Sequence, residues 1–344
     1  MNLVAAATGA VERMALPDVV TRAGISMLVD RTGRRLDRAA SVDEAAFARG
    51  MAAHPIAVRP DAANAQHYEL PPAFFGHILG PRRKYSCCLY DGSGDAADGL
   101  AAAEERALEA TAAHAGLADG QRILELGCGW GSLSLWMAER YPAARITAVS
   151  NSAPQRGYIE AEAARRGAAN LRVVTADMND FAADGLFDRI VSVEMWEHMS
   201  NWEALLERVR GWIAADGRLF LHVFSHRTMP YRFDTSDASD WIAQHFFTGG
   251  IMPSHGLIRH LDASFRLEEE WRWSGVNYQR TADDWLRRFD ANDAAISVIL
   301  REVYGSQAGL WKRRWRLFFL ATAGLFGARG GADWGVSHYR LRPR

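Results

Sequence analysis

From about residue 120 onward, short apolar runs alternate with stretches of helical periodicity. The apolar runs predict strands at 122–127, 145–150, 171–177, 187–194 and 217–225. Helices are predicted between most of them, at 133–141, 154–167 and 202–214. Strands that are apolar along nearly their whole length are typical of a parallel sheet covered on both faces. The pattern therefore predicts an α/β core over about residues 110–225.

The segments on either side of this core are mainly helical. Ser41 and Glu44 have the spacing of a helix-opening capping box, and the pair Pro71-Pro72 suits the start of a short helix. A long amphipathic helix is expected at 97–116, and helical structure is expected over 281–328. Residues 226–258 lose the alternation. Two late strands, at 265–274 and 335–344, would complete the sheet. The chain then divides into four parts, at 1–65, 66–110, 111–225 and 226–344.

The composition is that of an ordinary globular protein. The chain has 344 residues, 49% apolar and 24% charged, with 40 basic and 41 acidic side chains and a net charge of −1. Disordered and coiled-coil classes are excluded by these values, and a nucleic-acid binder would carry a basic excess. Lys84 and Lys312 are the only lysines among the basic residues. This bias towards arginine predicts a bacterial source with a GC-rich genome.

The number of cysteines, the apolar segments and the absence of a zinc motif predict the compartment and the metal content. The three cysteines, Cys87, Cys88 and Cys128, form no disulfide framework and fit a reducing compartment. The first 20 residues lack a basic leader region, and the apolar run at 317–328 is too short to span a bilayer, which takes roughly 20 residues. A cytoplasmic protein without an integral membrane segment is expected. The zinc pattern H-E-x-x-H does not occur, so no metal is predicted.

The most informative motif is a glycine turn that follows the first predicted strand. It reads Glu125-Leu-Gly127-Cys-Gly129-Trp-Gly131 and opens a helix. The dinucleotide fingerprint G-x-G-x-x-G has another spacing, and an acid beside the turn would repel a pyrophosphate. The same acid suits a ligand with a cationic amine and no phosphate. The turn therefore resembles the first motif of Rossmann-like methyltransferases and predicts S-adenosylmethionine instead of NAD.

Polar residues follow the next two strands. Ser150, Asn151 and Gln155 could bond ribose hydroxyls, although Ser152 and Gln155 would also serve as helix-capping residues. Asp177 and Met178 end the third strand, where such enzymes hold the adenine. These residues complete the predicted cofactor set.

Several motifs together resemble one family. HYELPPAFF, KYSCCLY, ILELGCGWGSLSLW, VSVEMWEHM and QHFFTGGIMPS are similar to the cyclopropane fatty acid synthase family of methyltransferases, with the strongest likeness to its coclaurine N-methyltransferase branch. The resemblance runs from about residue 66 to the C-terminus. It implies a class I methyltransferase fold with a mostly parallel seven-stranded sheet. It also implies a covering segment at 66–110, in which Tyr85 and Ser86 close over the cofactor, and a helical acceptor-binding cap at 226–344.

The resemblance implies two alternative sets of catalytic residues. Glu197 and His198 match the pair that binds and deprotonates an amine in the N-methyltransferase branch, and Glu194 matches a further acid there. In the cyclopropane synthases, residues matching Cys87, His222 and Tyr278 hold a bicarbonate together with the residue matching Glu197. Plain core packing is the alternative for Cys87, and a helix-end acid beside a satisfied histidine is the alternative for the Glu-His pair.

Three functions remain open from the sequence. The first is N-methylation of a small aromatic or benzylisoquinoline-like amine, and the second is methylation of a lipid acyl chain or carboxyl group. The third is a cofactor-binding protein that no longer catalyses, which intact Glu197 and His198 argue against. An aromatic cluster could line an acceptor pocket or form plain core: Trp241, Phe246, Phe247, Trp285, Trp311 and Trp315. A homodimer is left open.

Overall fold

The computed structural model describes residues 12, 16–38, 43–58, 70–91, 99–233, 235–236 and 240–344. Its centre is a sheet of seven strands in the order β3-β2-β1-β4-β5-β9-β8. The strands are β1 (Arg122–Leu126), β2 (Arg145–Ser150), β3 (Leu171–Thr175), β4 (Phe187–Val193), β5 (Ile213–His226), β8 (Phe265–Ser274) and β9 (Trp334–Pro343). The first five strands are parallel, and β9 runs antiparallel between β5 and β8. A separate pair is formed by β6 (Tyr231–Arg232) and β7 (Ile251–Met252). The predicted mostly parallel seven-stranded sheet is confirmed.

Successive residues of the central strands point to opposite faces, and both faces are buried. On β1, Ile123 packs with α6 (Leu100–Ala115) and α7 (Ser132–Arg140). The next residue, Leu124, packs on the other side with α9 (Trp202–Arg210) and α3 (Glu44–Met51). The period of two therefore explains why these strands are apolar throughout. The remaining helix of the core, α8 (Ala153–Arg166), covers β3 and packs against α7.

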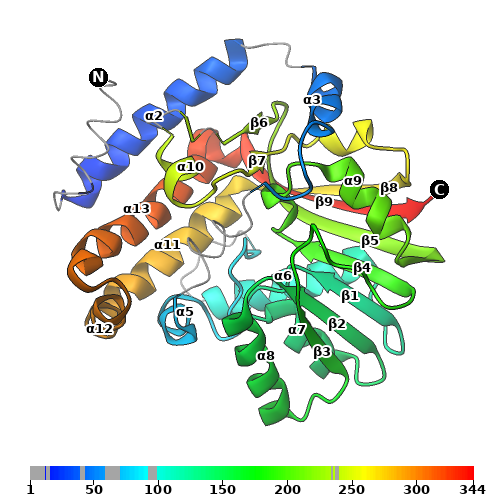
Figure 1. Ribbon diagram of the computed structural model, residues 1–344. Helices are drawn as coiled ribbons and strands as arrows, with labels where there is room; N and C mark the ends of the chain where they lie inside the picture. Colours follow the sequence, from blue (N-terminus) through cyan, green and yellow to red (C-terminus); the bar gives the residue numbers. More distant parts are fainter. Residues whose placement is uncertain are drawn as a thin grey trace.

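A helical layer stands beside this core. It contains α2 (Asp18–Arg38), α5 (Pro72–Ile78), α11 (Gly275–Ala291), α12 (Asp293–Tyr304) and α13 (Ala308–Gly327), with the short α10 (Trp241–His245). Figure 1 shows α2, α11, α12 and α13 gathered on one side of the molecule, with the sheet and α7 and α8 on the other. Aromatic side chains fill the layer, and Trp285 and Trp315 are almost fully buried in it. This layer is the helical cap that the sequence predicts.

Some predicted boundaries are wrong. The helix expected to end at 214 ends at Arg210, and β5 begins at Ile213, because the apolar residues after Gly211 fit either periodicity. The helical stretch expected at 281–328 is three helices that start at Gly275. Asp43 caps α3 by accepting a bond from the Ala45 amide, at a position that the sequence did not predict as the cap. Ser41 lies outside the described residues.

One prediction about organisation is not tested by this arrangement. The division at 65, 110 and 225 stays a prediction, and its first boundary, like the start of the HYELPPAFF motif, lies outside the described residues. Within the described residues, no helix has the length and apolar character needed to cross a membrane.

Candidate functional site

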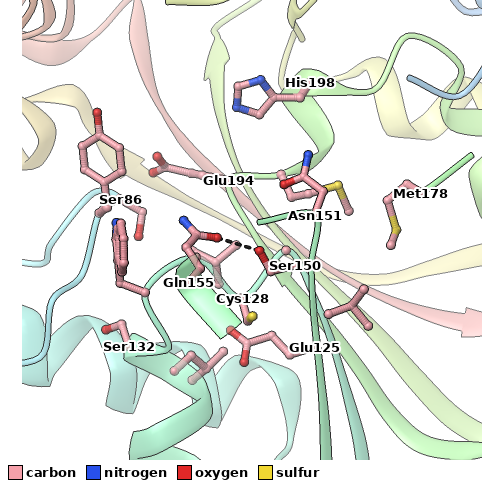
Figure 2. Close-up of a pocket in the computed structure, with 18 of the residues that line it drawn as sticks. Ser86, Glu125, Cys128, Ser132, Ser150, Asn151, Gln155, Met178, Glu194 and His198 are labelled. Carbon is pink, nitrogen blue, oxygen red and sulfur yellow. Dashed lines mark hydrogen bonds between the residues drawn. The ribbon is translucent and has the colours of Figure 1, made fainter. Parts of the chain in front are cut away.

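A pocket opens beyond the carboxyl ends of β1, β2 and β4, which is the edge where open α/β sheets bind ligands. Most of the predicted cofactor and catalytic residues line it, as Figure 2 shows for many of them. These residues are Tyr85, Ser86, Glu125, Gly127, Gly129, Ser150, Asn151, Gln155, Asp177, Met178, Glu194 and His198. Five predicted site residues do not line it: Cys87, Gly131, Glu197, His222 and Tyr278.

The three glycines of the turn have positive φ angles but different surroundings. At Gly127, where φ is 80°, a Cβ atom would lie 2.5 Å from Met195 Cγ. At Gly131, where φ is 76°, it would lie 2.7 Å from Ile159 Cγ1. At Gly129, where φ is 52°, a Cβ atom would meet nothing within 4 Å. Gly127 and Gly131 are thus required by close packing, whereas Gly129 leaves its backbone open towards the pocket.

Glu125 lies at the base of the pocket with its carboxylate held by α7. Ser134 donates a hydrogen bond to Glu125 Oε2, and both side chains are buried. Burial raises the pKa of Glu125 to about 8. A cationic group in the pocket would stabilise the ionised form and lower this pKa.

The end of β2 combines helix capping with pocket lining. Ser152 is the N-cap of α8 and accepts a bond from the Gln155 amide. Ser150 Oγ donates to Gln155 Oε1 at 2.6 Å, the contact marked in Figure 2. This bond turns the side-chain nitrogen of Gln155, Nε2, away from Ser150, and Nε2 is buried without a partner. The capping interpretation is therefore correct for Ser152, while Gln155 keeps a free donor.

Two more pocket-lining residues have buried polar atoms without a partner. These atoms are Trp130 Nε1 and Ser132 Oγ, both next to the glycine turn. A buried donor without an acceptor costs about 1–3 kcal/mol. Such donors gathered around one pocket indicate a polar ligand.

Glu194 is the centre of the site. Its backbone has a φ of 49°, which is uncommon for a residue with a side chain. Glu194 Oε1 accepts a bond from the Cys87 amide at 2.9 Å and lies 3.2 Å from His222 Nε2, and Tyr278 OH donates to Oε2 at 2.6 Å. Burial raises the pKa of this carboxyl, and the nearby Lys84 ammonium opposes the shift.

This grouping corrects the arrangement implied by the resemblance. Cys87, His222 and Tyr278 do converge, but on Glu194 and not on Glu197. Cys87 takes part through its backbone amide, because its thiol donates to Cys88 O and burial raises the thiol pKa.

Glu197 and His198 follow on a single 3₁₀ turn, Trp196–His198. Glu197 is fully buried, and its Oε1 accepts a bond from the Phe224 amide at 2.6 Å. Its other oxygen, Oε2, is buried without a partner. Burial raises the pKa of Glu197 well above its usual range, and the charge of Glu194 raises it further. His198 stacks on Phe247 with ring centroids 5.2 Å apart and lines the pocket.

Most of the aromatic cluster proves to be core. Trp285 and Trp315 are buried within the cap, and Phe246 stacks on Phe318 with centroids 4.3 Å apart. Trp241 packs against Phe246, and Trp311 stacks on Tyr304. Phe247 differs from the others because it contacts His198, a residue of the site.

Lys84 also belongs to the site, although no sequence motif predicts it. Its side chain is buried at the pocket wall and donates to Ser86 Oγ at 2.5 Å and to Cys87 O at 2.8 Å. The signal was present, since Lys84 is one of two lysines in a chain that otherwise uses arginine. A compact ammonium fits a buried corner that a guanidinium would not. No group of His, Cys, Asp and Glu suited to a metal occurs among the described residues.

Comparison with known proteins agrees with this geometry. The family model described as mycolic acid cyclopropane synthetase matches residues 57–330. An (S)-coclaurine N-methyltransferase of Thalictrum flavum subsp. glaucum is 34% identical over 294 residues, covering 84% of this chain and 81% of that relative. The cyclopropane-fatty-acyl-phospholipid synthase of Escherichia coli (strain K12) is 29% identical over 273 residues, covering 79% of this chain and 66% of that relative.

A solved structure is similar over nearly the whole chain. The crystal structure of coclaurine N-methyltransferase bound to N-methylheliamine and S-adenosylhomocysteine superposes with a TM-score of 0.89 at 31% identity, covering 96% of this chain and 97% of the other. S-adenosylhomocysteine is what remains of S-adenosylmethionine after methyl transfer. The chain belongs to the mycolic acid cyclopropane synthetase family and is an S-adenosylmethionine-dependent methyltransferase.

Proposed function

We propose that this enzyme transfers a methyl group to the nitrogen of a small aromatic amine of benzylisoquinoline type. The observation that carries the proposal is the pair formed by Glu194, whose side chain is 8% exposed, and fully buried Glu197, whose Oε2 is left without a partner. Burial and the charge of Glu194 both raise the pKa of Glu197, and an ammonium group would relieve both the repulsion and the missing bond. The coclaurine N-methyltransferases among the relatives support the same acceptor chemistry.

We assign the cofactor to the pocket over the glycine turn. The open space at Gly129 and the free donors of Trp130, Ser132 and Gln155 fit a ligand of its size and polarity. When bound there, S-adenosylmethionine would supply an electrophilic methyl group on its sulfonium. The remaining predicted cofactor contacts, from Tyr85 and Ser86 to Asp177 and Met178, belong to this proposal.

The two carboxyls take different tasks in this proposal. Glu197 binds the ammonium through its free oxygen and has no partner besides the Phe224 amide in the described contacts. Glu194 accepts the proton, because Tyr278 and His222 already orient it and His222 provides an onward path. His198 and Phe247 form one wall of the acceptor site, and their ring faces suit an aromatic cation.

A lipid acceptor is the second candidate, and one observation favours it. The residues that hold a bicarbonate in the resembling synthases, Cys87, His222 and Tyr278, are all present and close together. Here, however, they bind the Glu194 carboxylate. The chain's own carboxylate thus takes the position that a bicarbonate would need, which argues for the amine.

The test is a labelled-methyl assay with purified enzyme on three acceptor panels: cyclic aromatic amines, unsaturated phospholipids and free fatty acids. We expect the labelled methyl group to appear in amines alone. In Glu197→Gln the labelling of amines should be lost, because the KM for the amine rises. Label in phospholipids or fatty acids with none in amines would overturn the proposal. Added bicarbonate separates the two mechanisms further, since only the synthase type should depend on it.

Source, compartment and assembly stay predictions. The relatives come from plants and from Escherichia coli, so they do not distinguish a bacterial origin. Cytoplasmic location and a homodimer rest on the sequence alone.

A further inference from the structure

Three histidine rings continue the site beyond Glu194 in a line. His222 Nε2 contacts Glu194 Oε1 at 3.2 Å, and His222 Nδ1 lies 2.9 Å from His338 Nε2. His338 Nδ1 in turn lies 2.8 Å from His114 Nδ1. From Glu194 as far as His114 Nδ1, every ring nitrogen on this path faces another hydrogen-bonding group. The four side chains therefore form one continuous hydrogen-bonded chain.

The fold places each ring from a different element. His222 on β5 and His338 on β9 are direct partners in the antiparallel register. His114 lies in the last turn of α6, and its ring stacks on Trp271 of β8 with centroids 3.9 Å apart and planes 3° apart. His222 and His338 are fully buried, while His114 is half-buried. The chain thus runs from the buried site across the sheet to a partly exposed helix end.

The surroundings keep the rings neutral. Burial lowers the pKa of His222 and His338 well below the usual value, and the Lys84 ammonium acts in the same direction. Burial also lowers the pKa of His114, with Arg340 adding to the effect and Glu269 opposing it. A neutral imidazole has one donor nitrogen and one acceptor nitrogen. A row of neutral rings can therefore keep its hydrogen bonds in either of two arrangements, which differ in the nitrogen of each ring that carries the proton.

We propose that Glu194, His222, His338 and His114 form a proton relay that carries the proton lost by the methyl acceptor to water. The proposal rests on the proposed function in that an ammonium is the proton donor. Its N–H bond breaks, the proton goes to Glu194, and nitrogen keeps the electron pair for the methyl carbon. Glu194 passes a proton to His222 Nε2, His222 Nδ1 passes one to His338 Nε2, His338 Nδ1 passes one to His114 Nδ1, and His114 Nε2 releases one to water. Each ring gains one proton and loses one.

Packing alone does not account for this row. Positions such as 222 and 338 point into the sheet layer between Phe220, Trp273 and other apolar rings. An apolar side chain would fill the same space without the cost of burying polar atoms. Among the described contacts of His114, Nε2 has no hydrogen-bond partner, so it is the nitrogen from which a proton can leave.

The test interrupts the relay at its two outer rings. His338→Gln keeps the size and a hydrogen bond but cannot pass a proton through. His114→Ala removes the partly exposed ring and leaves room for imidazole from solution. The matched control is His255→Gln, a half-buried histidine that bonds Ser337 beside the relay but belongs to no part of it.

We expect kcat to fall by at least about tenfold in both relay variants, less than the about 10²-fold or more that direct general-base catalysis contributes, with KM and cofactor affinity unchanged. Imidazole added to His114→Ala should restore kcat, more so at a pH where imidazole is neutral, and it should not restore His338→Gln. Stopped-flow recording with a pH dye should show proton release lagging behind methyl transfer in both. Unchanged kcat in the two variants, or a loss that neither imidazole nor buffer concentration alters, would overturn the relay.

Failure of the relay and failure of the amine assignment remain distinguishable. The wild-type acceptor panel decides the acceptor first, and the relay variants are compared afterwards on whichever acceptor is active. Cyclopropane formation on a lipid also releases one proton, so the rate loss and the imidazole rescue are expected there too. Should the amine panel fail, those two readouts on the lipid acceptor still support or reject the relay.

Discussion

Replacing Glu194 by glutamine removes the charge at the centre of the site with little change of shape. The carboxylate accepts bonds from the Cys87 amide and Tyr278 and faces His222 Nε2, and an amide retains only one accepting oxygen. The tyrosine hydroxyl and the imidazole tautomer can both reverse their roles, so we expect Glu194→Gln to fold. What it cannot do is accept the acceptor's proton.

The magnitude follows from that lost step. General-base catalysis contributes about 10²-fold to 10⁴-fold, so the barrier should rise by about 3–5 kcal/mol. The assay is the single-turnover rate of methyl transfer at saturating cofactor and amine, with cofactor affinity measured by calorimetry on the same preparation. Glu197→Gln is the contrasting variant, because its main loss should be in KM, where one charged hydrogen bond of about 1.5–3 kcal/mol corresponds to about 10-fold to 150-fold. A Glu194→Gln rate within about threefold of wild type would refute the role of Glu194 as the base.

Four further outcomes are expected. Gly129→Val should lower S-adenosylmethionine affinity at least about tenfold in a folded protein, because its side chain would enter the open space of the pocket; unchanged calorimetric affinity would reject that placement. Since ionised Glu125 binds a cation better and its pKa is about 8, cofactor affinity should rise between about pH 6 and about pH 8, and Glu125→Gln should flatten the profile. Tyr278→Phe should lower kcat about tenfold or more by removing one bond to Glu194, with a normal melting temperature as the check on folding. NAD at millimolar level should give no thermal stabilisation, whereas S-adenosylhomocysteine should; the reverse result would contradict the cofactor assignment.

The parts of the fold that could be predicted were those that depend on hydrophobic periodicity and on residues typical of turns. β8 is found at the residues expected, 265–274, and Ser274 at its end caps the helix that follows. The glycine turn was predicted from its motif, and the positive φ angles of Gly127, Gly129 and Gly131 are a local backbone requirement that glycine meets. These features depend on neighbours in the sequence.

Contacts between segments distant in the sequence could not be predicted in this way. Glu194 and Cys87 are 107 residues apart, and nothing in either motif indicates that an amide of one binds the carboxylate of the other. Glu197 was expected at the centre of the site because it belongs to the Glu-His pair. Instead, Glu194, whose φ is positive, directs its own side chain towards Cys87, His222 and Tyr278. His114 and His338 carry no motif at all, and only the register of β9 brings them into line.

The position of β9 also has a consequence for the order in which the protein can form. In the described sheet, β8 joins the other strands only through β9, and β5 has β9 as its outer neighbour. During synthesis the edge of β5 therefore stays unpaired until residues 334–343 have left the ribosome, well after the parallel strands are complete. An unpaired edge is where growing chains associate wrongly. A chain shortened by its last ten residues should accordingly accumulate as aggregate, with both halves of the sheet present in sequence but never joined.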